Sequence, residues 1–274
     1  MVGIVPLDWG ELNLGNRSRR TYNYVMKSNQ DRSWLFNGSV ENETRLKPLC
    51  QQVEAQFHLP ARRLCRYFAR LDNGPLVQRF GKTFRGLHIP FSDREELSND
   101  FSKEIFDCFF LPFDDTPAQA VQAFDNMIYI RNSTCDDTTG LVTTYAHELQ
   151  HFVQHGTMPR VMRVNMLLQQ NLKRLEPSAI TTDVPIEKEA NIVSKRVAEV
   201  VCGVESVRAF AEKQINLMEQ PDVQDERTRW IFFRDMPSSI EYDYLADTLR
   251  LVEKYKTVLD FGIDVNQPEW WVEP

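Results

Sequence analysis

The spacing of hydrophobic positions predicts the elements at the centre of the chain most clearly. Residues 126–133, NMIYIRNS, alternate β-branched and aromatic side chains and are bounded by Asn and Ser, which predicts a strand. The stretch CDDTTG then offers N-cap side chains for a helix that runs to about His155, with Gly156 as its C-terminal stop. The apolar residues of this helix form one stripe and predict its core-facing side: Leu141, Val142, Tyr145, Leu149, Phe152 and Val153. The opposite side is expected to face solvent: Thr143, Gln150 and Gln154.

The rest of the chain is predicted to be mainly helical. Residues 43–72 are expected to form two helices broken at HLPA, and residues 79–91 a strand or hairpin. The apolar run 104–113 is a helix or a strand, because periodicity does not decide between them. Further helices are predicted over three segments: 158–175, about 185–202 before a stop at Gly203, and most of 204–259 with an interruption near 229–237. The fold class that follows is helix-rich α+β.

Four regions can be distinguished along the chain. Residues 1–40 are irregular and polar, and are expected to pack as an extension on the body. Residues 41–115 form an N-terminal region of helices and strands, residues 116–205 form the central core, and residues 206–274 form a C-terminal helical region. A chain of 274 residues is also short enough for all four regions to make one compact domain.

Composition and charge narrow the class of protein. Hydrophobic residues make up 42% of the chain and charged residues 26%, which are ordinary values for a globular protein. The formal net charge of −7 argues against a broad nucleic-acid-binding surface. A local basic cluster, ARRLCRYFAR, is expected to lie on the solvated face of a helix. The 5 cysteines are widely spread without a CxxC pair, which predicts reduced thiols.

The start of the sequence and its apolar runs bear on location. The first residues lack the basic and apolar regions of a secretory signal. No run approaches the roughly 18 apolar residues that a membrane span requires. We therefore expect a cytoplasmic protein that does not enter a membrane, and the sequence makes no prediction of its oligomeric state.

The central helix carries the residues that point to chemistry, in AHELQHFVQH. His147 and His151 are separated by about 40° and 6 Å on a helix, so both imidazoles can bind one ion. Glu148 lies on the same side and can reach a water bound to that ion. The pattern H-E-x-x-H therefore predicts a zinc site with two histidine ligands and Glu148 as general base. His155 lies about 80° and 12 Å from His147, and is expected to be a bystander near the helix end.

A catalytic zinc site normally takes a third protein ligand, and a following helix offers two candidates. Its first turn contains Glu187 and Glu189, whose side chains point about 160° apart. Glu187 lies with Asn191 on a small, partly polar face suited to packing against another helix, whereas Glu189 leans towards Arg196 and the charged side. Helical phase favours Glu187 as the ligand, with Glu189 as the alternative. Both can also be acids that only suit a helix N-terminus.

HELQH followed by E-x-E-A-N resembles the gluzincin metallopeptidases, in particular the ImmA/IrrE-like family of cytoplasmic bacterial and phage proteases. The matching residues are His147, Glu148, His151, Glu187, Glu189, Ala190 and Asn191. The resemblance implies a zincin-like core in which a small mixed or antiparallel sheet packs on the HExxH helix. It also implies that Glu187 is the third ligand and that Asn191 steadies a ligand histidine. Val193 and Ser194 replace the family's Phe-Ala, and the resemblance covers about residues 120–205.

These residues predict a zinc-dependent endopeptidase that hydrolyses peptide bonds with Glu148 as general base. The resemblance implies a protein substrate such as a regulator or repressor, and implies that the strand MIYIR pairs with an extended peptide; the alternative is an ordinary inner strand. An oxyanion-stabilising group is also required, for which His88, Tyr242 and Tyr244 are candidates. Two other functions compete with the peptidase. One is a zinc-binding regulatory or effector protein whose site is structural or catalytically silent, and the other is a helical binding module with an accidental motif.

Overall fold

The computed structural model describes five segments of the chain: residues 34–36, 40–68, 85–90, 126–218 and 224–262. The chain divides into two compact units, Met1–Asp31 and Arg32–Pro274, and every described residue belongs to the second. The apolar run 104–113 and most of the expected extension 1–40 lie outside the described residues. The proposed division into four regions stays a prediction.

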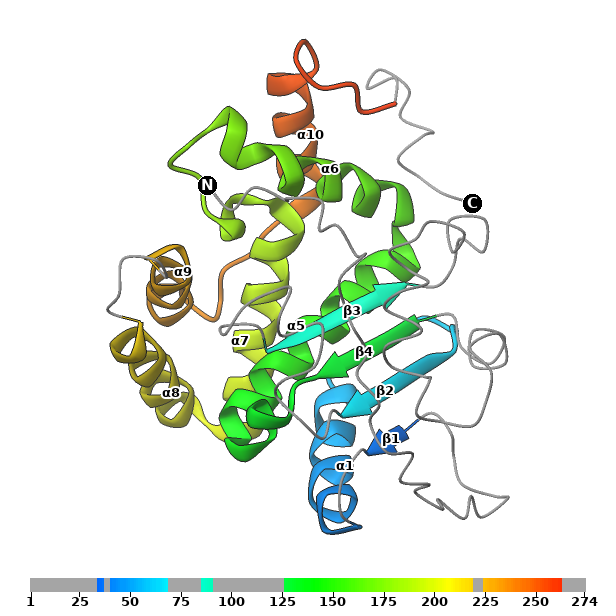
Figure 1. Ribbon diagram of the computed structural model, residues 1–274, viewed down its shortest axis with the longest axis vertical. Coiled ribbons are helices and arrows are strands. Elements are labelled where there is room, and N and C mark those ends of the chain that lie inside the picture. Colours follow the sequence, from blue (N-terminus) through cyan, green and yellow to red (C-terminus); the bar gives the residue numbers. More distant parts are fainter. Residues whose placement is uncertain (1–33, 37–39, 69–84, 91–125, 219–223, 263–274) are drawn as a thin grey trace, which may run out of the picture. The chain divides into compact units, whose positions relative to one another are not determined.

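The described strands form a small mixed sheet in the order β1-β2-β4-β3 (Figure 1). They are β1 (Trp34–Phe36), β2 (Leu64–Phe68), β3 (Gly86–Pro90) and β4 (Asn126–Ile130). β1, β2 and β4 run parallel, and β3 runs antiparallel to β4 with His88 opposite Ile128. Every residue of β4 is buried, as expected for an inner strand covered on both faces. The strand predicted within 126–133 is confirmed, and so is the strand within 79–91 where it is described.

Helices pack around this sheet and extend away from it (Figure 1). They are α1 (Val40–Glu54), α5 (Thr138–Thr157), α6 (Pro159–Leu175), α7 (Pro185–Cys202), α8 (Val204–Leu217), α9 (Gln224–Asp235) and α10 (Tyr244–Tyr255), with 3-10 turns η3 (Asn132–Asp136) and η4 (Thr181–Asp183). The helix-rich α+β class is therefore confirmed. None of the described helices combines the length and the apolar character that crossing a membrane requires.

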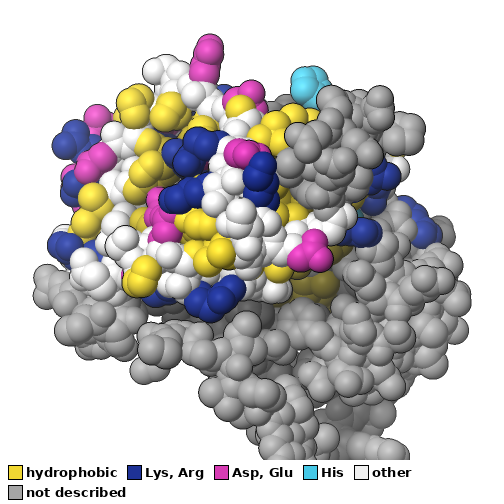
Figure 2. All heavy atoms as spheres, turned by 90° about the horizontal axis from the view of Figure 1, so that it is seen from above, with side chains coloured by type: hydrophobic (Ala, Val, Ile, Leu, Met, Phe, Trp, Pro, Cys, Tyr) yellow, Lys and Arg dark blue, Asp and Glu magenta, His cyan; other side chains and the backbone are white. Residues whose placement is uncertain are grey.

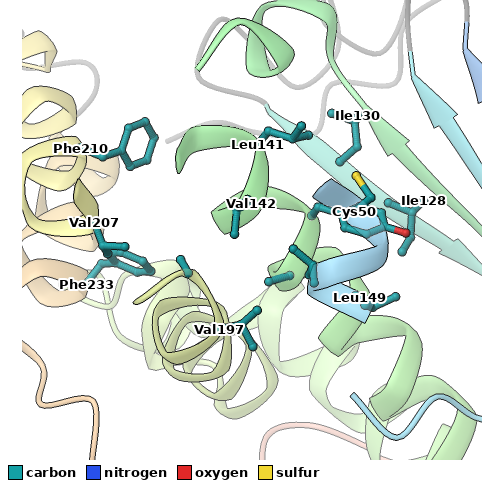
Figure 3. Close-up of a cluster of buried hydrophobic side chains, with 14 of the residues drawn as sticks. Cys50, Ile128, Ile130, Leu141, Val142, Leu149, Val197, Val207, Phe210 and Phe233 are labelled. Carbon is teal, nitrogen blue, oxygen red and sulfur yellow. The ribbon is translucent and has the colours of Figure 1, made fainter. Parts of the chain in front are cut away.

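The central helix α5 is buried on more sides than its apolar stripe requires. Figure 3 shows side chains of β4 and α1 on one side of it and side chains of α8 and α9 on the other: Ile128, Ile130 and Cys50, then Val207, Phe210 and Phe233. The predicted solvent side is wrong, because Thr143, Gln150 and Gln154 are buried. Both glutamines donate hydrogen bonds to Glu189 of α7, so a polar contact between two helices replaces the expected contact with water.

Residues 64–68 form β2, so the second helix predicted within 43–72 is wrong. The expected solvated cation Arg66 is instead largely enclosed. Its Nε donates to Glu54 Oε1 at 2.6 Å and to Tyr145 Oη at 3.3 Å, and its guanidinium lies 4.8 Å from the centre of the Trp34 ring. Because Glu54 belongs to α1 and Tyr145 to α5, this one cation ties the sheet to both helices.

The C-terminal end of α5 also differs from its prediction. The helix does not stop at Gly156 but continues to Thr157. A Cβ placed on Gly156 would lie 2.5 Å from Cγ of Pro60, so this glycine permits a close approach of the segment after α1. The stop predicted at Gly203 is confirmed, since this residue follows α7 with a φ of 87°.

Candidate metal centre

Two helix starts set the positions of the candidate metal ligands. α5 begins after Asp137, whose carboxylate accepts a hydrogen bond of 3.0 Å from the backbone N–H of Gly140. α7 begins at Pro185, a residue suited to the first helical position, and carries Glu187 in its first turn. α5 and α7 pack against each other over much of their length (Figure 1). Glu187 therefore faces the HExxH residues of α5.

His147, His151 and Glu187 form a buried cluster whose ligand atoms all lie within 4.8 Å of one another. The two Nε2 atoms are 3.1 Å apart. Glu187 Oε2 lies 3.4 Å from Nε2 of His147, and its Oε1 lies 3.6 Å from Nε2 of His151. Ligand atoms bound tetrahedrally at about 2.0–2.1 Å from zinc are about 3.4 Å from one another. The three distances match this spacing, so the two imidazoles and the carboxylate fit a single zinc ion.

The charge states of these side chains also suit a cation. Burial lowers the pKa of His147 to about 4, which keeps its imidazole neutral near pH 7. Burial alone would raise the pKa of Glu187, but His151 and His147 outweigh it and lower this pKa to about 2. Zinc binds neutral imidazoles and ionised carboxylates. His147 and Glu187 present these forms without a protonation change.

Glu148 is buried between the cluster and β3. Its carboxyl group accepts a hydrogen bond from the backbone N–H of His88, and burial raises its pKa to about 7. β3 comes this close because residue 86 is glycine: a Cβ on Gly86 would lie 2.7 Å from Cγ2 of Thr144 and 3.1 Å from Cγ of Glu148. The glycine thus sets the distance between β3 and the predicted general base.

The buried side chain of Gln154 contacts His151 at the ring nitrogen that lies away from the cluster. His151 Nδ1 lies 2.8 Å from Gln154 Oε1, and Gln154 Nε2 donates to Glu189 Oε2 at 2.7 Å and to the Ile186 carbonyl at 3.0 Å. Gln150 Nε2 donates to the same Glu189 oxygen at 3.1 Å. Because the Gln154 nitrogen has two acceptors, its oxygen must face His151 and accept from Nδ1–H. The lone pair of His151 Nε2 is then left for the metal.

The structure separates the two candidate glutamates. Glu187 belongs to the cluster, whereas Glu189 holds the two glutamines and does not lean towards Arg196. Asn191 does not take the position that the resemblance implied. Its Nδ2 donates to the Glu187 carbonyl at 2.8 Å, and its Oδ1 accepts from Nε of Arg229 at 3.4 Å. Asn191 therefore steadies the turn that carries Glu187, and Gln154 is the residue that steadies a ligand histidine.

Two further histidines, His155 and His88, lie together outside the cluster. The rings of His155 and His88 are 5.8 Å apart, and His88 Nε2 lies 3.0 Å from Asn126 Oδ1. Burial lowers the pKa of His88 well below its usual range, so its imidazole is neutral. Nε2 of His88 thus contacts Asn126 and its ring lies beside His155, whereas its Nδ1 is buried without a hydrogen-bond partner among the described residues. The backbone N–H of His88 donates to Glu148.

The two tyrosines considered as oxyanion donors are also engaged with other groups. Tyr242 Oη donates to Asp247 Oδ2 at 2.6 Å, and its ring lies under Nζ of Lys188. Tyr244 Oη lies 3.2 Å from Sδ of Met158. These contacts direct both hydroxyl groups to neighbours outside the cluster.

β4 lies between β2 and β3 and is hydrogen-bonded along both edges. The expectation that MIYIR pairs with an extended peptide is therefore wrong, and this segment is an ordinary inner strand. β3 ends the described strand order on the side where Glu148 lies.

Comparisons with protein-family models, with curated proteins and with solved structures found no match for this chain. What the structure supports is a cluster of His147, His151 and Glu187 compatible with an HExxH-type zinc site. The function is therefore inferred from the chemistry of this cluster and its surroundings.

Proposed function

We propose that this protein is a zinc-dependent endopeptidase of the gluzincin type, with an ImmA/IrrE-like arrangement of motifs on a zincin-like core. The observation that carries the proposal is the buried set of His147, His151 and Glu187 at tetrahedral spacing, with Glu148 next to it. Two histidines and a glutamate are a known ligand set of catalytic zinc in peptidases. The adjacent carboxylate supplies the base that H-E-x-x-H chemistry requires.

In the proposed reaction Glu148 moves one proton. When bound, zinc supplies Lewis acidity, which polarises a carbonyl group and lowers the pKa of water. The Glu148 carboxylate takes a proton from the attacking water, whose oxygen bonds to the carbonyl carbon of the peptide. Protonated Glu148 gives this proton to the amide nitrogen as the C–N bond breaks, and the products are a peptide with a terminal carboxylic acid and an amine. The hydrogen bond from the backbone N–H of His88 on β3 orients the carboxyl group of Glu148.

The proposed substrate is an extended segment of another protein, such as a regulator or repressor. β3 is the strand whose backbone reaches the base, so a peptide lying along it would bring its bonds to Glu148. On the face shown in Figure 2, Lys and Arg side chains lie among acidic and hydrophobic ones. This mixture suits a protein partner better than a nucleic acid. A cytoplasmic location stays a prediction.

The proposal is tested by Glu148→Gln, with Glu205→Gln on the exposed face of α8 as a control for loss of one carboxylate. We expect both variants to retain zinc, and Glu148→Gln to lose at least about 100-fold in the cleavage of casein and of a peptide library. Full cleavage by Glu148→Gln would contradict the role of the base. Zinc without cleavage in the unaltered protein would favour the structural or silent site, and chelation should then lower folding stability.

A further inference from the structure

Peptide hydrolysis needs a group that stabilises the negative charge formed on the carbonyl oxygen, and removal of one such group typically costs about 100- to 1,000-fold in rate. We propose that Arg229, on α9, is this group. The inference rests on the proposed function and adds a catalytic residue to it. His88, Tyr242 and Tyr244 were the candidates from sequence. Nε2 of His88 contacts Asn126, and the hydroxyl groups of Tyr242 and Tyr244 contact Asp247 and Met158.

Hydrogen bonds place Arg229 next to the metal ligand of α7. Its Nε donates to Asn191 Oδ1 at 3.4 Å, and Asn191 in turn donates to the Glu187 carbonyl. Residues 187 and 191 are four apart on a helix, so their side chains lie on one face about 6 Å from each other. This is the face from which Glu187 reaches His147 and His151. The guanidinium therefore lies one helical turn from the ligand carboxylate, on the side of the cluster.

Arg229 also has hydrogen-bond capacity left for a ligand. Within the described part of the chain its only hydrogen bond is the one made by Nε, and its Nη1 lies 3.6 Å from Glu226 Oε2. Its side chain is 27% exposed, so the terminal nitrogens can be reached. A guanidinium with free N–H groups can donate to an anionic oxygen.

The residue after Arg229 packs against α8, and Arg229 itself contacts α7. Trp230 is buried and packs against Phe210 of α8 with ring centres 5.4 Å apart. Arg229 instead donates to Asn191 of α7.

The test compares Arg229→Gln and Arg229→Lys with Arg234→Gln, which removes the same charge from the same helix at a surface ion pair with Asp235. Three properties are measured on zinc-loaded protein: zinc content, the Kd of the small anionic ligand acetohydroxamate, and kcat/KM on a peptide cleaved from the library. We expect every variant to keep zinc and a normal circular dichroism spectrum. Arg229→Gln should bind acetohydroxamate at least about 10-fold more weakly and lose about 100- to 1,000-fold in kcat/KM, mostly in kcat. Arg229→Lys should keep part of the acetohydroxamate affinity and part of kcat/KM, because it keeps the positive charge.

The outcomes separate this inference from the proposed function. If the unaltered protein cleaves peptides and Arg229→Gln cleaves and binds acetohydroxamate equally well, the role of Arg229 is overturned and the peptidase stands. If the unaltered protein cleaves nothing but its acetohydroxamate binding depends on Arg229, the peptidase is overturned and the position of Arg229 beside the metal is supported. If Arg234→Gln loses as much acetohydroxamate binding and kcat/KM as Arg229→Gln, the inference is also overturned. Such losses would result from removing one positive charge from α9, whatever its position.

Discussion

Replacement of Gln154 by methionine separates metal affinity from folding stability. Gln154 is 1% exposed, and methionine has a similar volume without hydrogen-bonding groups, so the change removes contacts while leaving little cavity. Gln150→Met is the matched control. It lies one turn earlier on α5 and also donates to Glu189, but it has no hydrogen bond to His151.

The structure gives the size of both effects. Gln154→Met removes contacts with His151, Glu189 and the Ile186 carbonyl, and at about 0.5–1.5 kcal/mol each this lowers the free energy of unfolding by about 1.5–4.5 kcal/mol. His151 also loses the acceptor that fixes its tautomer, which typically weakens metal binding about 10- to 100-fold. Gln150→Met removes one hydrogen bond, so we expect a loss of about 0.5–1.5 kcal/mol in unfolding free energy and unchanged zinc affinity.

Both quantities can be measured on the same preparations. Zinc affinity is obtained by competition with a chromophoric chelator, and unfolding free energy by urea denaturation of the metal-free proteins. We expect the two variants to differ in zinc affinity by about 10-fold or more. Equal zinc affinity in Gln154→Met, Gln150→Met and the unaltered protein would refute the role given to Gln154.

Three further predictions concern packing and metal-dependent stability. Gly86→Ala places a methyl group 2.7 Å from Cγ2 of Thr144, so it should lower the unfolding free energy by about 1–3 kcal/mol in urea denaturation; an unchanged value would mean that β3 does not pack closely on α5. Lys195→Met removes the donor that holds the carbonyls of Arg234 and Met236 at 2.9 and 2.6 Å, and should cost about 1–3 kcal/mol in the same assay, where no loss would contradict this capping of α9. Zinc at 100 times its Kd should stabilise the folded protein by about 2.7 kcal/mol, visible as a rise in Tm that a chelator reverses. If neither zinc nor chelator changes the Tm, a metal site formed by folding is contradicted.

The elements predicted correctly are those specified by nearby residues. β4, the start of α5 and both ends of α7 follow from alternation, an N-cap aspartate, Pro185 and Gly203, all within or next to the element itself. β2 was predicted wrongly because its central residue, Arg66, is charged. Its strand conformation depends on Glu54 and Tyr145, which lie 12 and 79 positions away in the sequence. Distant partners of this kind leave no local pattern.

The candidate site, too, was predicted only where residues close in the sequence determine it. Helical phase favoured Glu187 over Glu189 as the ligand. It did not predict that Glu189 also contacts side chains of α5, Gln150 and Gln154. The role of Gln154 depends on Glu189, 35 positions away, and that of Arg229 depends on the packing of α9 against α7. The C-terminal end of α5 depends on Pro60, which the sequence places far from Gly156. These features required the tertiary structure.

The most direct test of the central claim is the zinc content of four purified proteins, measured by elemental mass spectrometry. They are the unaltered chain, His151→Ala, Glu187→Ala and Glu189→Ala. We predict about one zinc ion per chain in the unaltered protein and in Glu189→Ala, and loss of zinc in His151→Ala and Glu187→Ala. Equal zinc in all four proteins, or loss in Glu189→Ala with zinc retained in Glu187→Ala, would contradict the metal centre described for α5 and α7.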